Sequence, residues 1–116
     1  MAKPKTRTAA IKQAKTIGFL HSGKKANHTT QFNVFKGSLQ LAGYVEGQNL
    51  TVVDLWADND PGALQQNARN LAGSAPDLIV AAGGSASVMA AKVETLNTAT
   101  PIPVVFFRPR RAAGLR

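Results

Sequence analysis

Short apolar runs alternate along the chain with segments of helical spacing, and this alternation constrains the fold more than any other feature. Four runs rich in β-branched, aliphatic or aromatic residues predict strands at 16–20, 50–56, 77–82 and 101–107. Between them, apolar residues recur at spacings of three and four, which is typical of helices with one buried face. Strands that alternate with helices form a parallel sheet with helices on both faces. The sequence therefore predicts an α/β fold of four parallel strands in the order β-α-β-α-β-α-β.

Residues that favour helix ends support this division. The first predicted helix follows capping-type residues at 27–30 and ends at Gly43. The second begins after Asp60, a favourable N-cap residue, with Pro61 at the first helical position, and it runs to about Gly73. These signals place the helices independently of the apolar spacing.

A parallel sheet of this kind binds ligands in a crevice at the carboxyl ends of its strands. In this chain those ends are residues 21–23, 57–58, 83–85 and the residues after 107. Candidate functional residues are therefore sought first at these four positions.

Charge and length divide the chain into three parts. The formal charge of +8 on 116 residues comes from +5 in residues 1–15, −1 in residues 16–107 and +4 in residues 108–116. We expect a basic N-terminal tail, one α/β lobe and a basic C-terminal tail, with these boundaries. Because the lobe carries no basic stripe, we do not expect its surface to bind nucleic acid. The chain has no cysteine, which excludes disulfides and thiolate metal sites.

The segment from Gly18 to Lys25 nearly matches the phosphate-binding pattern G-x-x-x-x-G-K-[ST]. Two details disagree with it. Lys25 stands where a hydroxyl would hold Mg²⁺, and Gly18 lies within a predicted strand rather than in a loop. In a true phosphate-binding loop Lys24 would be the lysine that contacts the phosphate. We expect this match to the pattern to be a coincidence, and we expect no nucleotide hydrolysis.

The turn Gly83-Gly84-Ser85 follows the third predicted strand and opens the third predicted helix, which runs to Leu96. Glycines allow a ligand to approach the backbone, and free N–H groups with a serine hydroxyl at a helix start suit a carboxylate or phosphate. A tight turn with a serine cap would give the same pattern. Both interpretations stay open.

The two histidines, His21 and His28, have neither the spacing nor the cysteine partners of a metal site, so we expect no metal and no cofactor. His21 and Ser22 lie at a strand end where they could contact a ligand, whereas His28 belongs to the start of a helix. Ser22, His21 and Asp58 contain the residue types of a catalytic triad, but no sequence feature places them together. We expect no catalysis.

The single tryptophan, Trp56, ends the second predicted strand. It fits either core packing or an aromatic wall of a pocket. Asp54 lies within the same strand and is expected to turn towards the edge of the strand or a loop, whereas Phe32 and Phe35 are expected in the core.

Four stretches resemble a known family: residues 17–23, 42–50, 56–58 and 77–84. They are similar to the substrate-binding proteins of ABC transporters, in the group with tryptophan/tyrosine-type and uncharacterised members. The most specific stretch is Ala-Gly-Tyr-Val-Glu-Gly-Gln-Asn-Leu at 42–50. The resemblance covers about residues 15–107.

The resemblance implies a partial first lobe of a periplasmic binding protein, with a Rossmann-like α/β architecture. Such proteins capture a small organic solute, often amino-acid-like, without catalysis and pass it to an ABC permease. Members bind their ligand with strand-end loops of the first lobe, and the helix start at Ser85 would receive a carboxylate. The ligand-binding residues expected here are His21, Ser22, Trp56, Asp58, Gly83, Gly84 and Ser85.

The chain also departs from the family. Members are longer, carry an export signal and continue into a second lobe, whereas residues 108–116 are arginine-rich. We expect a truncation or frame change there and weak ligand affinity. Exposed apolar surface should also cause self-association or marginal folding. The apolar run after residue 15 is too short for a secretory signal. The chain as written therefore predicts a cytoplasmic location, although the resemblance implies a periplasmic one. The alternative is a stand-alone module that binds nucleic acid or an acidic partner through its basic tails.

Overall fold

The computed structural model describes residues 14–96, 98 and 101–107, so the C-terminal tail and nearly all of the N-terminal tail lie outside the described residues. Its strands are β1 (Lys15–His21), β2 (Leu50–Trp56), β3 (Leu78–Ala82) and β4 (Val104–Phe107). Its helices are the short 3₁₀ helix η1 (Lys25–Asn27), α2 (Thr29–Leu41), α3 (Pro61–Gly73) and α4 (Ser85–Thr95). All neighbouring strands are parallel, in the order β2-β1-β3-β4. The predicted four-stranded parallel α/β fold is confirmed.

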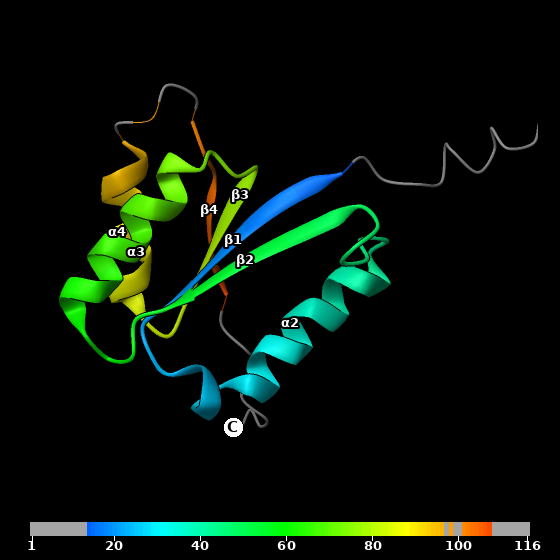
Figure 1. Cartoon of the computed structure of the whole chain (residues 1–116), viewed down its shortest axis with the longest axis horizontal. Coiled ribbons are helices and arrows are strands. Elements are labelled where there is room, and N and C mark those ends of the chain that lie inside the picture. Colours follow the sequence, from blue (N-terminus) through cyan, green and yellow to red (C-terminus); the bar gives the residue numbers. More distant parts are fainter. Residues whose placement is uncertain (1–13, 97, 99–100, 108–116) are drawn as a thin grey trace, which may run out of the picture.

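Helices cover both faces of the sheet. Figure 1 shows α2 on one face and α3 with α4 on the other. Each face has its own apolar core. Between the sheet and α2 the core is Ile17, Phe19, Phe32, Phe35, Leu50, Val80 and Ala82. Between the sheet and the other two helices it includes Leu20, Leu64, Ala68, Leu71, Ile79, Ala90 and Ala91.

Strand β1 is central and is buried on both faces. Because successive side chains of a strand point to opposite faces, Phe19 enters the core under α2 and Leu20 enters the core under α3 and α4. Both side chains are fully buried. Gly18 lies within this strand, where a Cβ atom would stand 2.9 Å from Cδ2 of Leu71 in α3. Gly18 therefore permits close helix packing and is not part of a phosphate-binding loop.

The helix ends follow the sequence signals with one correction. The Asp60 carboxylate accepts hydrogen bonds from the N–H groups of Gly62 and Ala63, as expected of an N-cap. Gly43 follows α2 with a φ of +100°, a conformation that favours glycine. The N-cap of α4, however, is Gly84 and not Ser85, and no side chain caps this helix. The serine cap, one of the two interpretations left open for this turn, is therefore wrong, because Ser85 is the first residue of the helix itself.

Strand β4 begins three residues later than expected. Pro101 and Pro103 lack N–H groups for a sheet ladder, and regular pairing starts at Val104. Pro103 still contributes its carbonyl, which accepts from the Ile79 N–H at 2.9 Å. At the other end of the chain, β1 begins at Lys15, which had been assigned to the tail.

No helix in the described part of the chain is long and apolar enough to cross a membrane.

Candidate ligand-binding site

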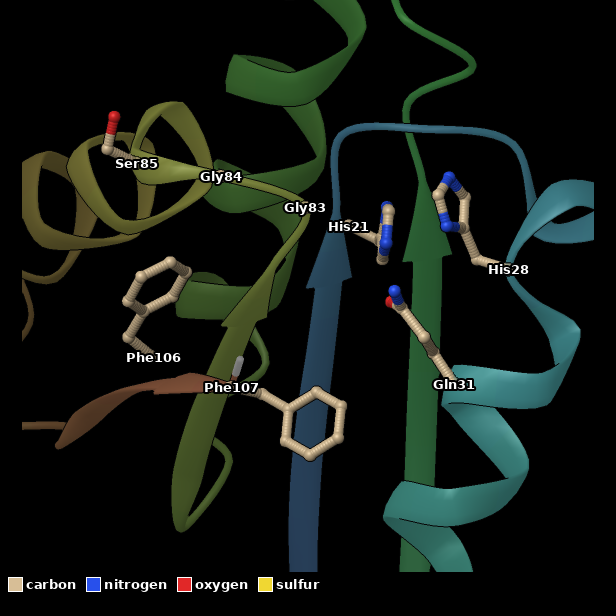
Figure 2. Close-up of a pocket in the computed structure, with 8 residues that line it drawn as sticks. All are labelled: His21, His28, Gln31, Gly83, Gly84, Ser85, Phe106 and Phe107. Atoms are coloured by element: carbon tan, nitrogen blue, oxygen red, sulfur yellow. The ribbon is translucent and has the colours of Figure 1, made fainter. Parts of the chain in front are cut away.

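An open pocket of about 440 Å³ lies where β1 and β3 end side by side. The connection through α2 leads from β1 to β2 on one side of it, and the connection through α3 returns across the sheet to β3. This reversal is the position at which open parallel sheets bind ligands. The residues that line the pocket are drawn in Figure 2 and are His21, His28, Gln31, Gly83, Gly84, Ser85, Phe106 and Phe107.

The turn at Gly83 and Gly84 brings backbone to the rim of this pocket. The two residues have φ values of +90° and +128°, which side chains rarely adopt. A Cβ atom on Gly83 would lie 2.6 Å from the Ser22 hydroxyl oxygen and 2.8 Å from the His21 ring. The Ser22 hydroxyl donates a hydrogen bond of 3.0 Å to the Gly83 carbonyl and so fixes the turn. Glycine at 83 is therefore a requirement of the close approach between these two strand ends.

Helix α4 starts at this turn with an uncapped end. The first N–H groups of an α-helix have no acceptor within the helix. Here the Gly84 N-cap has no side chain to accept from them, although its carbonyl accepts from the Ser87 N–H at 3.2 Å. Ser85, the first residue of α4, lines the pocket. Uncapped N–H groups and the positive end of the helix dipole suit an anionic group such as a carboxylate.

His21 is buried at the back of the pocket with only 1% of its surface exposed. Its Nδ1 accepts a hydrogen bond of 2.8 Å from the Gly23 N–H, so the neutral ring carries its proton on Nε2. That buried Nε2 has no hydrogen-bond partner among the described residues. Burial and then the nearby His28 lower the pKa of His21, while the Gln31 side chain acts in the opposite direction.

Aromatic rings surround His21 on two sides. Its ring centroid lies 4.3 Å from that of His28 and 4.6 Å from that of Trp56, with the Trp56 ring nearly parallel to it. Trp56 also packs against Phe19 and Phe32, with centroid separations of 5.5 and 5.7 Å. Trp56 thus supports His21 from the core and does not line the pocket.

The Trp56 indole is itself fixed by an acidic group. Its Nε1–H donates a hydrogen bond of 2.8 Å to the Asp54 carboxylate, which also lies 3.1 Å from the Lys25 Nζ. Partial burial acts to raise the pKa of Asp54, but the Trp56 hydrogen bond and the Lys25 ammonium together hold it below its ordinary value. Asp54 is therefore ionised at neutral pH and anchors the aromatic group.

Four of the seven predicted ligand-binding residues meet at the pocket, and three do not line it. His21, Gly83, Gly84 and Ser85 line the pocket. Ser22 supports the turn and lines a separate hollow of about 200 Å³ beside Asp60 and Ala86. The backbone N–H of Asp58 donates to the Gly23 carbonyl at 3.0 Å, in the loop after β2. Trp56 stands behind His21, as described above.

The candidate triad is not assembled. The Ser22 hydroxyl donates to the Gly83 carbonyl, and the His21 Nδ1 accepts from the Gly23 N–H, so each is engaged by backbone. Lys24 precedes η1 with an exposed side chain. Among the residues that the structure describes, no group of three or more histidine and carboxylate side chains is placed to hold a metal ion.

Sequence reasoning missed half of the pocket lining. His28 and Gln31 lie one helical turn apart at the start of α2, where they face the end of β1 (Figure 2). Their spacing of three was the available signal, but it identifies a shared face and not what that face meets. Phe106 and Phe107 end β4, and the expected contact region began only after them.

Two solved structures resemble the chain. One is the ligand-free, open structure of CD0873, a substrate binding protein with adhesive properties from Clostridium difficile, with a TM-score of 0.69 and 26% identity over 80% of this chain and 30% of that chain. The other is a conserved domain protein from Vibrio cholerae, with a TM-score of 0.67 and 27% identity over 89% of this chain and 33% of that chain. No protein-family model and no curated protein sequence matches the chain. The chain resembles part of a substrate binding protein, and it spans about a third of the length of both matched structures.

Proposed function

We propose that this chain captures a small, amino-acid-like organic solute, as the first-lobe part of an ABC-type solute-binding protein, and that it catalyses no reaction. The likeness to part of a substrate binding protein supports the class of function. One observation carries the proposal: the Gly83–Gly84 turn, the uncapped start of α4 and the buried His21 converge on one pocket.

The lining of the pocket indicates the chemistry of the solute. The N–H groups at the start of α4 suit a carboxylate, as the family resemblance also implies. Elsewhere in the lining, Phe107 and the half-buried His28 offer aromatic surface to an apolar or aromatic side chain. A solute with a carboxylate at one end and an apolar group at the other fits both.

The absence of catalysis is supported by the hydrogen bonds of the candidate nucleophile and base. Within the described residues, the Ser22 hydroxyl and the His21 Nδ1 are engaged by backbone groups rather than by each other. An activated serine needs its hydroxyl hydrogen-bonded to a base. Delivery of the solute to a permease and a location outside the cytoplasm belong to the same proposal, through the family resemblance.

Nuclear magnetic resonance of the ¹⁵N-labelled 116-residue chain tests this function. Titration with L-tryptophan and L-phenylalanine is expected to shift the amide signals of Gly83, Gly84 and Ser85. Dissociation constants on the order of 1 mM or weaker are expected, because an open half-site leaves much of the ligand in water. Titrations that leave these signals unchanged would contradict the proposal.

Two substitutions at one position separate the backbone from the side chain. Ser85→Pro removes an N–H at the first helical position, where proline is well tolerated, so the helix stays intact while a donor is lost. Ser85→Ala keeps that N–H and removes only the hydroxyl. We expect Ser85→Pro to weaken binding more than Ser85→Ala, and the reverse order would assign the contact to the hydroxyl.

The alternative function, binding of nucleic acid or an acidic partner, depends on the basic tails. The basic and acidic side chains of residues 14–107 balance in number, so any such binding must come from the ends of the chain. Tail-driven binding to a DNA oligonucleotide should weaken steeply as salt rises. Solute binding at the pocket should keep its affinity as salt rises. Oligonucleotide affinity that depends on residues 1–13 and 108–116, together with no solute effect, would favour the alternative.

A further inference from the structure

His21 is the one side chain of the pocket with a buried polar atom, Nε2, that lacks a hydrogen-bond partner among the described residues, although its Nδ1 accepts from the Gly23 N–H. Its Nε2 is inaccessible and makes no hydrogen bond there, although the ring lies beside the Gly83 turn that opens α4. A buried donor without an acceptor costs folding free energy, and a native fold that keeps one often uses it. The presence of this donor in the same pocket as the uncapped start of α4 therefore needs a functional explanation.

The orientation of the donor is fixed by its surroundings. The Gly23 N–H donates to Nδ1, which assigns the ring proton to Nε2. Trp56 and His28 pack against the ring at centroid separations of 4.6 and 4.3 Å. A ring flip would place a carbon opposite the Gly23 N–H and leave that second buried donor without an acceptor. The Nε2–H is thus preorganised in one direction.

Gln31 covers the path to this donor. Its amide lies beside the His21 ring in Figure 2, where side-chain hydrogen bonding by Gln31 acts to raise the pKa of His21, but it is not placed to complete a hydrogen bond to Nε2. Gln31 is only half-buried and stands in the first turns of α2, so its side chain has room to rotate. A ligand that displaces it would reach both Nε2 and the start of α4.

We propose that His21 determines the specificity of the pocket by donating its Nε2–H to a carboxylate oxygen of the ligand, next to the N–H groups that begin α4. This inference rests on the proposed function and names one side-chain contact within it. Two neutral donors on one carboxylate select for an anion without a lysine or arginine in the lining. A ligand that presents an ammonium group in place of the carboxylate is excluded, since neither donor can accept a hydrogen bond from it.

The probes that test this contact are phenylacetate and 2-phenylethylamine, which share an aromatic ring but carry opposite charges. In the ¹⁵N-histidine-labelled full chain, the free protein is expected to show His21 protonated on Nε2. Phenylacetate should shift the Nε2 signal together with the Ser85 amide signal, and 2-phenylethylamine should shift neither. A proton found on Nδ1, or a Ser85 shift with an unchanged His21 signal, would overturn the inference while leaving the proposed function intact.

Variants of His21 provide a second readout. His21→Phe keeps an aromatic ring of similar size without the donor and should bind phenylacetate at least about tenfold more weakly. His21→Gln restores an N–H in a similar position and should recover part of that loss. Equal affinity of both variants and the native chain would overturn the inference. If either variant fails to fold, the response of the native Nε2 signal to phenylacetate is sufficient to test the inference.

The covering role of Gln31 is tested in the same way. Gln31→Ala should bind phenylacetate at least as tightly as the native chain, because the path to Nε2 is open. Loss of the phenylacetate effect in Gln31→Ala would show that Gln31, and not His21, holds the carboxylate. A phenylacetate titration that shifts no pocket signal in any form of the chain would contradict the proposed function as well.

Discussion

The imidazole of His28 lies against that of His21 at the carboxyl end of β1, with ring centroids 4.3 Å apart and a tilt of 37°. Two protonated rings at this separation would repel one another. Burial of His21, followed by the proximity of His28, lowers the pKa of His21, and the Gln31 side chain opposes this. His21 is therefore neutral at pH 7, and the pocket presents an uncharged donor to its ligand.

This pairing predicts a dependence of stability on pH. The pKa of His21 is lower in the folded chain than its unfolded value of about 6.5, so the unfolded chain binds more protons below that pH. Stability is complete above about pH 6.5 and falls as the pH drops through and below this value. Urea unfolding at several pH values between about 7.5 and 5 measures it. His28→Gln removes one cause of the shift and should reduce the fall, whereas stability that is constant or rises towards pH 5 would contradict the prediction.

Two glycine substitutions should have opposite effects. Gly83→Ala places a Cβ 2.6 Å from the Ser22 hydroxyl at a φ of +90°, so we expect a loss of about 1–3 kcal/mol. Gly37→Ala lies inside α2 with nothing within 4 Å of the new carbon, so we expect a gain of about 0.5–1 kcal/mol. Equilibrium urea unfolding measures both. A neutral Gly83→Ala would show that the turn can relax away from His21.

Replacing the buried Ser87 by alanine should stabilise the fold. Ser87 is fully buried in the first turn of α4, and its hydroxyl has no hydrogen-bond partner among the described residues. Ser87→Ala should therefore raise the free energy of unfolding by about 1 kcal/mol or more. Ser85→Ala, in the same turn but exposed, controls for the difference in helix propensity. Equal effects of the two substitutions would indicate that the buried hydroxyl has a partner in solution.

The exposed edge strand β4 should cause the chain to self-associate. Strand β4 pairs only with β3 in the described structure, and Val105 and Phe106 are 48% and 38% exposed. An uncharged, apolar edge strand is a template for pairing with another chain. We expect sedimentation at rising concentration to show oligomers, and Val105→Lys to reduce them. A native chain that remains monomeric at all concentrations would contradict this prediction.

The sequence predicted the local elements well because their signals are local. Residues 50–56 form β2 as expected, and the Asp60 cap with Pro61 marks the start of α3. Besides the shifted starts of β1 and β4, one exception was Ser85, where the residue type suggested a cap but the helix starts one residue earlier, after Gly84 with its positive φ. That choice depends on Gly83 fitting against Ser22 and His21, which are far away in sequence.

The alternation of strands and helices, read from the sequence alone, determined the fold class and the edge of the sheet at which a ligand would bind. The tertiary structure decided which strand ends meet. Strand β1 pairs with both β2 and β3, so His21 lies beside the Gly83 turn, while Asp58 falls in the loop after β2. The tertiary structure also places the Ser22 hydroxyl where it donates a hydrogen bond to the Gly83 carbonyl. It places His28 and Gln31 beside His21 in the pocket lining. Periodicity reports which face of an element is buried, but strand order is set by packing between distant segments, whose energies depend on contacts that no local pattern contains.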